Sequence, residues 1–321
     1  MKTARLLPLF LVITSVASGA GWAELVRRGS ELAAAGDLAG AREAFRRALA
    51  GDDARVVPAE ALATVWSDIG VLSHRLEAFH DALAAYGRAR HIIEQAFGPD
   101  DWRLIGVLLN AATAYLDQAR FAEADRSSAR AESILDAQPA RDKWLLMRCR
   151  IVRAGVLMGR GEAARAAALL QDALSAAGAS PDRAVEAAAI LNNLAVISAH
   201  RSDWTAARMY VERSVALVEA AGPVNDTELI RPLLNAAHVA TMQRRHADAV
   251  AVLARALAIT DAQPGIGAAV RAHILNGYAA ALRNVGRKDE ARQAAARARA
   301  AGTPGGAETV DIYTLSVQPR R

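Results

Sequence analysis

Three asparagines stand at the same point of a repeating pattern and have the chemistry to hold a polypeptide. Asn110, Asn193 and Asn235 each lie two residues before an alanine. A carboxamide carries both donors and an acceptor, so one side chain can satisfy an extended backbone whatever its sequence. The same side chain can instead bond to a neighbouring helix and fix the packing there. The residues by themselves leave both roles open.

The sequence lacks the common signatures of catalysis and metal binding. It has no glycine-rich phosphate loop, no His-Glu-x-x-His and no Cys-x-x-Cys-His. Its seven histidines are scattered, and the pair of most interest, His200 and His238, does not make a metal site without further ligands. We therefore predict that the protein is not an enzyme and has no cofactor, no metal and no small-molecule substrate.

The asparagines belong to a repeat. Seven small residues, which we call the anchors, recur at steps of 41 or 42 residues: Gly29, Gly70, Ala112, Ala154, Ala195, Ala237 and Ala279. Alanine follows every anchor after twelve residues, and alanine or serine follows after nineteen. Small residues at fixed points let helices pack closely, and the large residues between them follow a helical period. Each repeat is therefore predicted to be a pair of helices.

This pattern resembles the tetratricopeptide repeat over about residues 22–300. The stretch Leu191-Asn-Asn-Leu-Ala195 carries the resemblance in the first helix, and Phe121-Ala-Glu-Ala124 carries it in the second. The long period is similar to that of the kinesin light chain variety. The resemblance implies an all-α fold, a right-handed superhelical α-solenoid of about seven helix pairs spanning residues 24–301.

The resemblance also implies a binding surface. In members of this family that bind extended peptides, the first helix of each repeat lines a concave groove, and asparagines two residues before the anchor hold the peptide backbone. It therefore implies that Asn110, Asn193 and Asn235 are groove residues, with bonding between neighbouring helices as the alternative. The other groove candidates on these helices are Asp68, Arg75, Asn192, His200, His238 and Asn276.

Residues 1–23 have the pattern of a secretory signal peptide. Two basic residues precede the apolar run Leu6–Val16, and small residues then allow cleavage after Ala20 or after Ala23. An uncleaved membrane anchor is the alternative, but the apolar run is shorter than the roughly 20 residues of a bilayer span. We expect a periplasmic or secreted protein without a stable membrane anchor after cleavage.

The charge pattern bears on the class of partner, and the cysteine content bears on disulfide bonding. The net charge is only +5, and the arginines are spread along the chain beside acidic residues. Nucleic-acid binding requires clustered basic residues with aromatic residues among them, so we expect no nucleic-acid partner. The single cysteine, Cys149, excludes an internal disulfide, and we expect it to be a buried apolar residue.

The C-terminal residues 302–321 differ from the repeats. Glycine and proline break the last helix, and the segment Thr309–Val317 is β-prone and too apolar for a free tail. We expect this tail either to dock on the last repeat or to remain flexible, and adding a strand to a partner's sheet is a further alternative.

The sequence thus predicts a non-enzymatic exported scaffold that binds an extended peptide or protein partner of the cell envelope in its concave groove. The alternative is a structural subunit of an envelope assembly, which contacts its partners through its convex face or its C-terminal tail.

Overall fold

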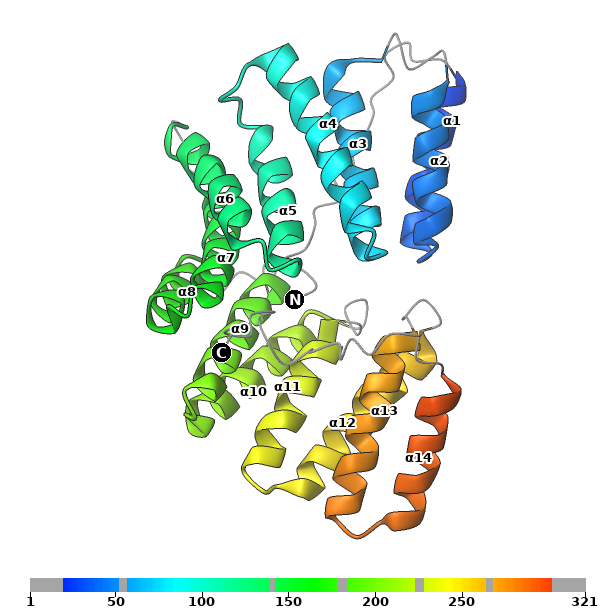
Figure 1. Cartoon of the computed structure of the whole chain (residues 1–321), viewed down its shortest axis with the longest axis vertical. Coiled ribbons are helices and arrows are strands. Elements are labelled where there is room, and N and C mark those ends of the chain that lie inside the picture. Colours follow the sequence, from blue (N-terminus) through cyan, green and yellow to red (C-terminus); the bar gives the residue numbers. More distant parts are fainter. Residues whose placement is uncertain are drawn as a thin grey trace. The chain divides into compact units, whose positions relative to one another are not determined.

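The computed structural model describes residues 20–51, 57–138, 142–177, 184–222, 228–263 and 268–301. Over these residues the chain forms fourteen α-helices and no strand, and the helices follow one another as antiparallel pairs (Figure 1). The predicted all-α class and the predicted seven helix pairs are confirmed. The right-handed superhelix stays a prediction. The tail 302–321 and residues 1–19 of the predicted signal peptide lie outside the described residues.

Two compact units divide the chain between Arg160 and Gly161. The N-terminal unit contains α1 (Ala20–Ala34), α2 (Leu38–Ala50), α3 (Ala59–Arg75), α4 (Phe79–Phe97), α5 (Leu104–Asp117), α6 (Phe121–Asp136) and α7 (Lys143–Gly159). The C-terminal unit contains α8 (Ala163–Ala177), α9 (Ala184–His200), α10 (Trp204–Ala220), α11 (Ile230–Met242), α12 (His246–Ala262), α13 (Ala268–Asn284) and α14 (Lys288–Ala300). The boundary falls within the fourth repeat.

Within each unit, every helix packs against the next one along the chain. The first helices of successive repeats also touch one another: α5 contacts both α3 and α7, and α9 contacts α11. We call α1, α3, α5, α7, α9, α11 and α13 the first helices and the others the second helices. The anchors and the groove candidates all lie on the first helices or at their carboxyl ends.

The turn between the two helices of a repeat has the same backbone conformation throughout. The residue seven positions after each anchor has a positive φ in all seven repeats: Gly36, Glu77, Ala119, Gly161, Ser202, Arg244 and Gly286. At Ala119 the N–H bonds to the carbonyl of Leu116 at 2.9 Å, and the next N–H bonds to the carbonyl of Tyr115 at 2.9 Å. These two bonds form the Schellman motif that closes many helices.

Two glycine anchors each make room for an aromatic ring of the second helix. A Cβ built on Gly70 would lie 2.4 Å from Cε1 of Tyr86, and a Cβ on Gly29 would lie 2.6 Å from Cε1 of Phe45. Both rings stand sixteen residues after their anchor. Where the anchor is alanine, the residue at that position is never aromatic. Anchor size and ring size are therefore matched within each repeat.

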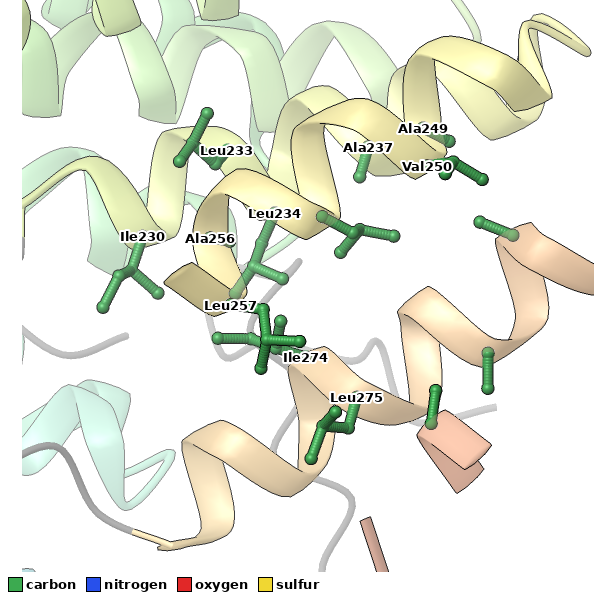
Figure 2. Close-up of a cluster of buried hydrophobic side chains, with 14 of the residues drawn as sticks. Ile230, Leu233, Leu234, Ala237, Ala249, Val250, Ala256, Leu257, Ile274 and Leu275 are labelled. Atoms are coloured by element: carbon green, nitrogen blue, oxygen red, sulfur yellow. The ribbon is translucent and has the colours of Figure 1, made fainter. Parts of the chain in front are cut away.

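Each unit has its own hydrophobic core. In the C-terminal unit, Leu234 of α11, Leu257 of α12 and Ile274 of α13 belong to one buried cluster, and Figure 2 shows their side chains between the three helices. In the N-terminal unit, Trp22 of α1 packs in a cluster with Phe45 of α2 and residues of α3. The described stack thus includes residues before position 24, where the sequence pattern places the start of the repeats.

Candidate functional site

The predicted groove asparagine of the third repeat is buried and forms a hydrogen bond within the protein. Asn110 lies on α5 and is only 2% exposed. Its Oδ1 accepts a hydrogen bond of 3.0 Å from Nη2 of Arg148 on α7. Arg148 is itself buried, and its guanidinium lies 4.9 Å from the ring centroid of Trp144. The bond therefore links the first helices of two successive repeats.

A second link of the same kind joins the fifth and sixth repeats. Nδ2 of Asn235 on α11 donates to Oδ1 of Asn192 on α9 at 2.8 Å, and both residues are buried. The stacking alternative, in which an asparagine bonds to a neighbouring helix, thus describes the hydrogen bonds of Asn110, Asn192 and Asn235. A buried carboxamide without such a partner would cost about 1–3 kcal/mol.

The other two asparagines remain accessible. Asn193 on α9 is half-buried and Asn276 on α13 is exposed. Neither carboxamide has a hydrogen-bond partner elsewhere in the described part of the chain. They therefore keep their full donor and acceptor capacity for a bound segment.

Asp68 lies at the asparagine position of the second repeat, on α3, and is half-buried. Its Oδ1 is buried and accepts no hydrogen bond from any described residue, and burial raises the pKa of the carboxyl well above 3.8. The buried phenol Oη of Tyr86 also has no partner there, and burial together with the nearby charge of Asp68 raises the pKa of Tyr86. A carboxyl that the fold buries and leaves unsatisfied favours its neutral form.

The remaining candidates lie at or near the carboxyl ends of first helices. Arg75 ends α3 and His200 ends α9, and both are exposed. His238 on α11 is half-buried, and its ring meets Trp204 edge-on with the centroids 6.0 Å apart. The structure therefore presents Arg75 and His200 at the surface, whereas His238 is partly engaged in packing.

Sequence reasoning missed a buried hydrogen-bonded pair in the N-terminal unit. Nε2 of His74 on α3 lies 2.6 Å from Oδ2 of Asp117 at the end of α5, and both side chains are almost fully buried. The ring of His74 also packs against Phe79, with centroids 5.5 Å apart. The two residues are 43 positions apart, one repeat plus one residue, and this spacing is the only signal in the sequence.

A basic hollow lies on the last repeat. It has a volume of about 620 Å³ and is lined by Arg283, Lys288, Ala291, Arg292, Ala295 and Arg299 of α13 and α14. Arg292 is paired with Asp289 at 2.8 Å. The two alanines contribute apolar lining, and the other four lining residues are basic.

Neither a metal centre nor a membrane span is found in the part of the chain that the structure describes. No group of three or more His, Cys, Asp or Glu side chains there is arranged to hold a metal ion. None of the helices in the described ranges combines the length and the hydropathy needed to cross a bilayer. Cys149 is buried on α7, and burial raises the pKa of its thiol to about 12.

Comparison with known proteins finds a family match over part of the repeats. Residues 186–259 match the family model described as tetratricopeptide repeat. None of the curated proteins matches the sequence. Sequence identity to the similar solved structures is low, so these show the fold alone.

Three of these structures cover most of the chain. NprR in complex with its cognate peptide NprX has a TM-score of 0.63 at 15% identity, with 85% of this chain and 79% of that chain covered. A Rap protein complexed with Competence and Sporulation Factor has a TM-score of 0.54 at 13% identity, with 87% and 97% covered. A tetratricopeptide repeat protein from Parabacteroides merdae has a TM-score of 0.53 at 15% identity, with 89% and 95% covered.

Proposed function

We propose that this tetratricopeptide repeat protein is a non-catalytic, exported scaffold that binds an extended segment of a protein partner along its first helices. The observation that carries the proposal is the division among the polar residues of these helices. Hydrogen bonds between first helices engage Asn110, Asn192 and Asn235. In contrast, no described residue forms a hydrogen bond with the side chain of Asp68 or Asn193.

The similar structures support a polypeptide as the ligand. NprR was solved with a peptide, and the Rap protein with Competence and Sporulation Factor. A helical repeat surface binds such segments without a catalytic centre. The proposed export rests on the signal-peptide pattern of residues 1–23, and a periplasmic or secreted location makes a partner in the cell envelope the natural one.

The chemistry of Asp68 suggests what the bound segment carries in the N-terminal unit. The carboxyl lacks both a hydrogen-bond partner and an ion pair in the described residues, and burial raises its pKa. A lysine or arginine of the partner that lies close to Asp68 would favour the charged carboxylate. Segments that bind this unit should therefore place a basic residue against Asp68.

The test begins with peptides selected on the purified full-length processed protein from a random displayed library. Binding of a selected peptide is then measured by fluorescence anisotropy for Asn193→Ala and Asp68→Ala. The matched control is Met209→Ala, because Met209 is exposed on the second helix α10. We expect Asp68→Ala to weaken peptides that bind the N-terminal unit, and Asn193→Ala to weaken those that bind the C-terminal unit, each about fivefold or more, in line with a loss of about 1 kcal/mol per hydrogen bond.

One specific observation bears on the alternative, a structural subunit of an envelope assembly that contacts its partners through its convex face or its C-terminal tail. The basic hollow on α13 and α14 lies beside Arg299, close to where the chain continues into the tail. The tail carries Glu308 and Asp311 among apolar residues. If deletion of residues 303–321 disrupts assembly while Asn193→Ala and Asp68→Ala leave partner binding unchanged, the alternative replaces the groove proposal.

A further inference from the structure

We infer that the signal peptide is cleaved after Ala20, so that the mature protein begins at Gly21. The inference rests on the proposed export and assigns its processing site. Two sites satisfy the need for small residues, one after Ser18-Gly-Ala20 and one after Gly21-Trp-Ala23. The sequence pattern favours neither. The packing of the residues between the two sites distinguishes them.

Trp22 lies between the two sites and belongs to the folded core. Its side chain is 2% exposed and is among the largest fully buried side chains of the described residues. It packs in one cluster with Phe45 of α2 and with Val65 and Ile69 of α3. Since the indole Nε1 has no hydrogen-bond partner in the described residues, the contribution of Trp22 to this cluster is apolar packing.

Cleavage after Ala23 would remove this core residue. It would also remove the first four residues of α1, which begins at Ala20. The gap left by an indole is large, and cores relax only partly around such gaps. The first repeat is poorly placed to compensate, because a terminal repeat has only one neighbour and the lone Cys149 provides no internal disulfide.

Cleavage after Ala20 keeps the whole cluster. Gly21 is exposed and Ala20 is the first residue of α1, so the new terminus would fall where the helix begins. Glu24 would then lie in the first turn of the shortened helix, where its charge complements the helix dipole. The position after Ala20 thus removes the leader and leaves the first repeat complete.

The direct test expresses the full-length chain in a bacterium with its own signal peptide and measures the intact mass and N-terminal sequence of the exported protein. We expect Gly21 as the first residue. A protein that begins at Glu24 overturns the cleavage site while leaving export intact. A chain that stays unprocessed inside the cell overturns both the cleavage site and the proposed export.

Matched variants at the two sites sharpen the result. Ala20→Gln places a bulky residue directly before the inferred cut, and Ala23→Gln does the same at the competing site. Ala20→Gln is expected to accumulate precursor, whereas Ala23→Gln is expected to be processed like the wild type. The opposite pattern contradicts the inference.

A stability measurement tests the structural reason. Two purified chains that begin at Gly21 and at Glu24 are compared by thermal unfolding, followed by circular dichroism. We expect the chain that begins at Glu24 to melt several degrees lower than the chain that begins at Gly21. Trp22→Phe in the longer chain is expected to keep most of its melting temperature. Equal melting temperatures for the two chains would remove the basis for choosing Ala20.

Discussion

Asn235 donates a hydrogen bond from Nδ2 to Oδ1 of Asn192 at 2.8 Å, and this bond joins α11 to α9 inside the C-terminal unit. The adjacent residue Asn193 makes no such bond and is partly accessible. Of these two neighbouring asparagines on α9, one is therefore hydrogen-bonded inside the stack and the other is not. A polar residue of a first helix stabilises the stack in one case and is available to a partner in the other.

This contrast predicts that two alanine substitutions differ in their effect on the free energy of unfolding. Asn235→Ala leaves the buried carboxamide of Asn192 without its partner, so we expect the free energy of unfolding to fall by about 1–3 kcal/mol. Asn193→Ala is expected to change it by less than about 0.5 kcal/mol. Urea unfolding followed by circular dichroism measures both. Equal stability losses would mean that Asn193 also fixes the stack.

The match between anchors and rings predicts a coupled pair. Gly70→Ala forces a methyl group against the ring of Tyr86, and overpacking of this kind costs about 1–3 kcal/mol. Tyr86→Leu alone leaves a gap and costs roughly 2 kcal/mol or more. The double variant reproduces the Ala154 and Leu170 pair of the fourth repeat. We expect its stability loss to be smaller than the sum of the two single losses, and strict additivity would refute the matching.

The left-handed turn residues predict a stabilising substitution. Ala119 has a φ of 55°, a conformation that costs an L-residue about 1–2 kcal/mol. Glycine avoids this cost but loses about 0.5–1 kcal/mol through its greater freedom in the unfolded chain. We therefore expect Ala119→Gly to raise the free energy of unfolding by about 0.5–1 kcal/mol. The control Ala129→Gly, at an exposed position inside α6, should lower it by about 1 kcal/mol.

Asp68 predicts how stability depends on pH. Burial raises the pKa of its carboxyl above 3.8 in the folded state, so the folded protein holds this proton more tightly than the unfolded chain. Its contribution to stability is complete below the unfolded pKa and is lost as the pH rises through the folded pKa. Asp68→Asn keeps the shape of the side chain without the ionisation.

We therefore expect Asp68→Asn to be more stable than the wild type at pH 7, with the difference shrinking as the pH falls toward 4. Urea unfolding between pH 4 and pH 8 measures this. Asp172→Asn, at an exposed position on α8, is the control and should leave the pH profile unchanged. A difference between Asp68→Asn and wild type that is constant with pH would show that Asp68 ionises normally in the folded state.

Cys149 predicts an unreactive thiol. Burial raises its pKa to about 12, so almost no thiolate is present at pH 8, and the thiolate is the reactive form. We expect the native protein to resist a thiol reagent at pH 8 and to react promptly in urea. Rapid labelling of the native protein would show that the cysteine is accessible.

Much of the fold follows from the sequence, because the anchors recur at a nearly constant step. Anchors at Gly70 and Ala237 both fall inside first helices, as the helical period predicts. At Gly36 and Gly286 the left-handed conformation suits the residue type, because glycine has no Cβ. The unexpected finding is that Glu77 and Arg244 adopt the same left-handed conformation, since neither residue type signals it.

The candidate site was harder to predict, because helical spacing gives the position of a residue along its own helix and not its neighbour on the next. Asn110 and Asn193 occupy equivalent positions in their repeats, yet only Asn110 is met by an arginine from the following first helix. Arg148 belongs to no repeating column, so nothing in the pattern marked it as a partner. Pairs of this kind are visible only once the helices are packed.

The shared turn conformation bears on how far the sequences of the repeats can differ. Four of the seven left-handed positions hold residues other than glycine, so the turn forms there in spite of the cost that this conformation carries for an L-residue. The repeats are therefore free to drift apart in sequence while the backbone stays the same. The family match covers residues 186–259, whereas the turn geometry recurs in all seven repeats.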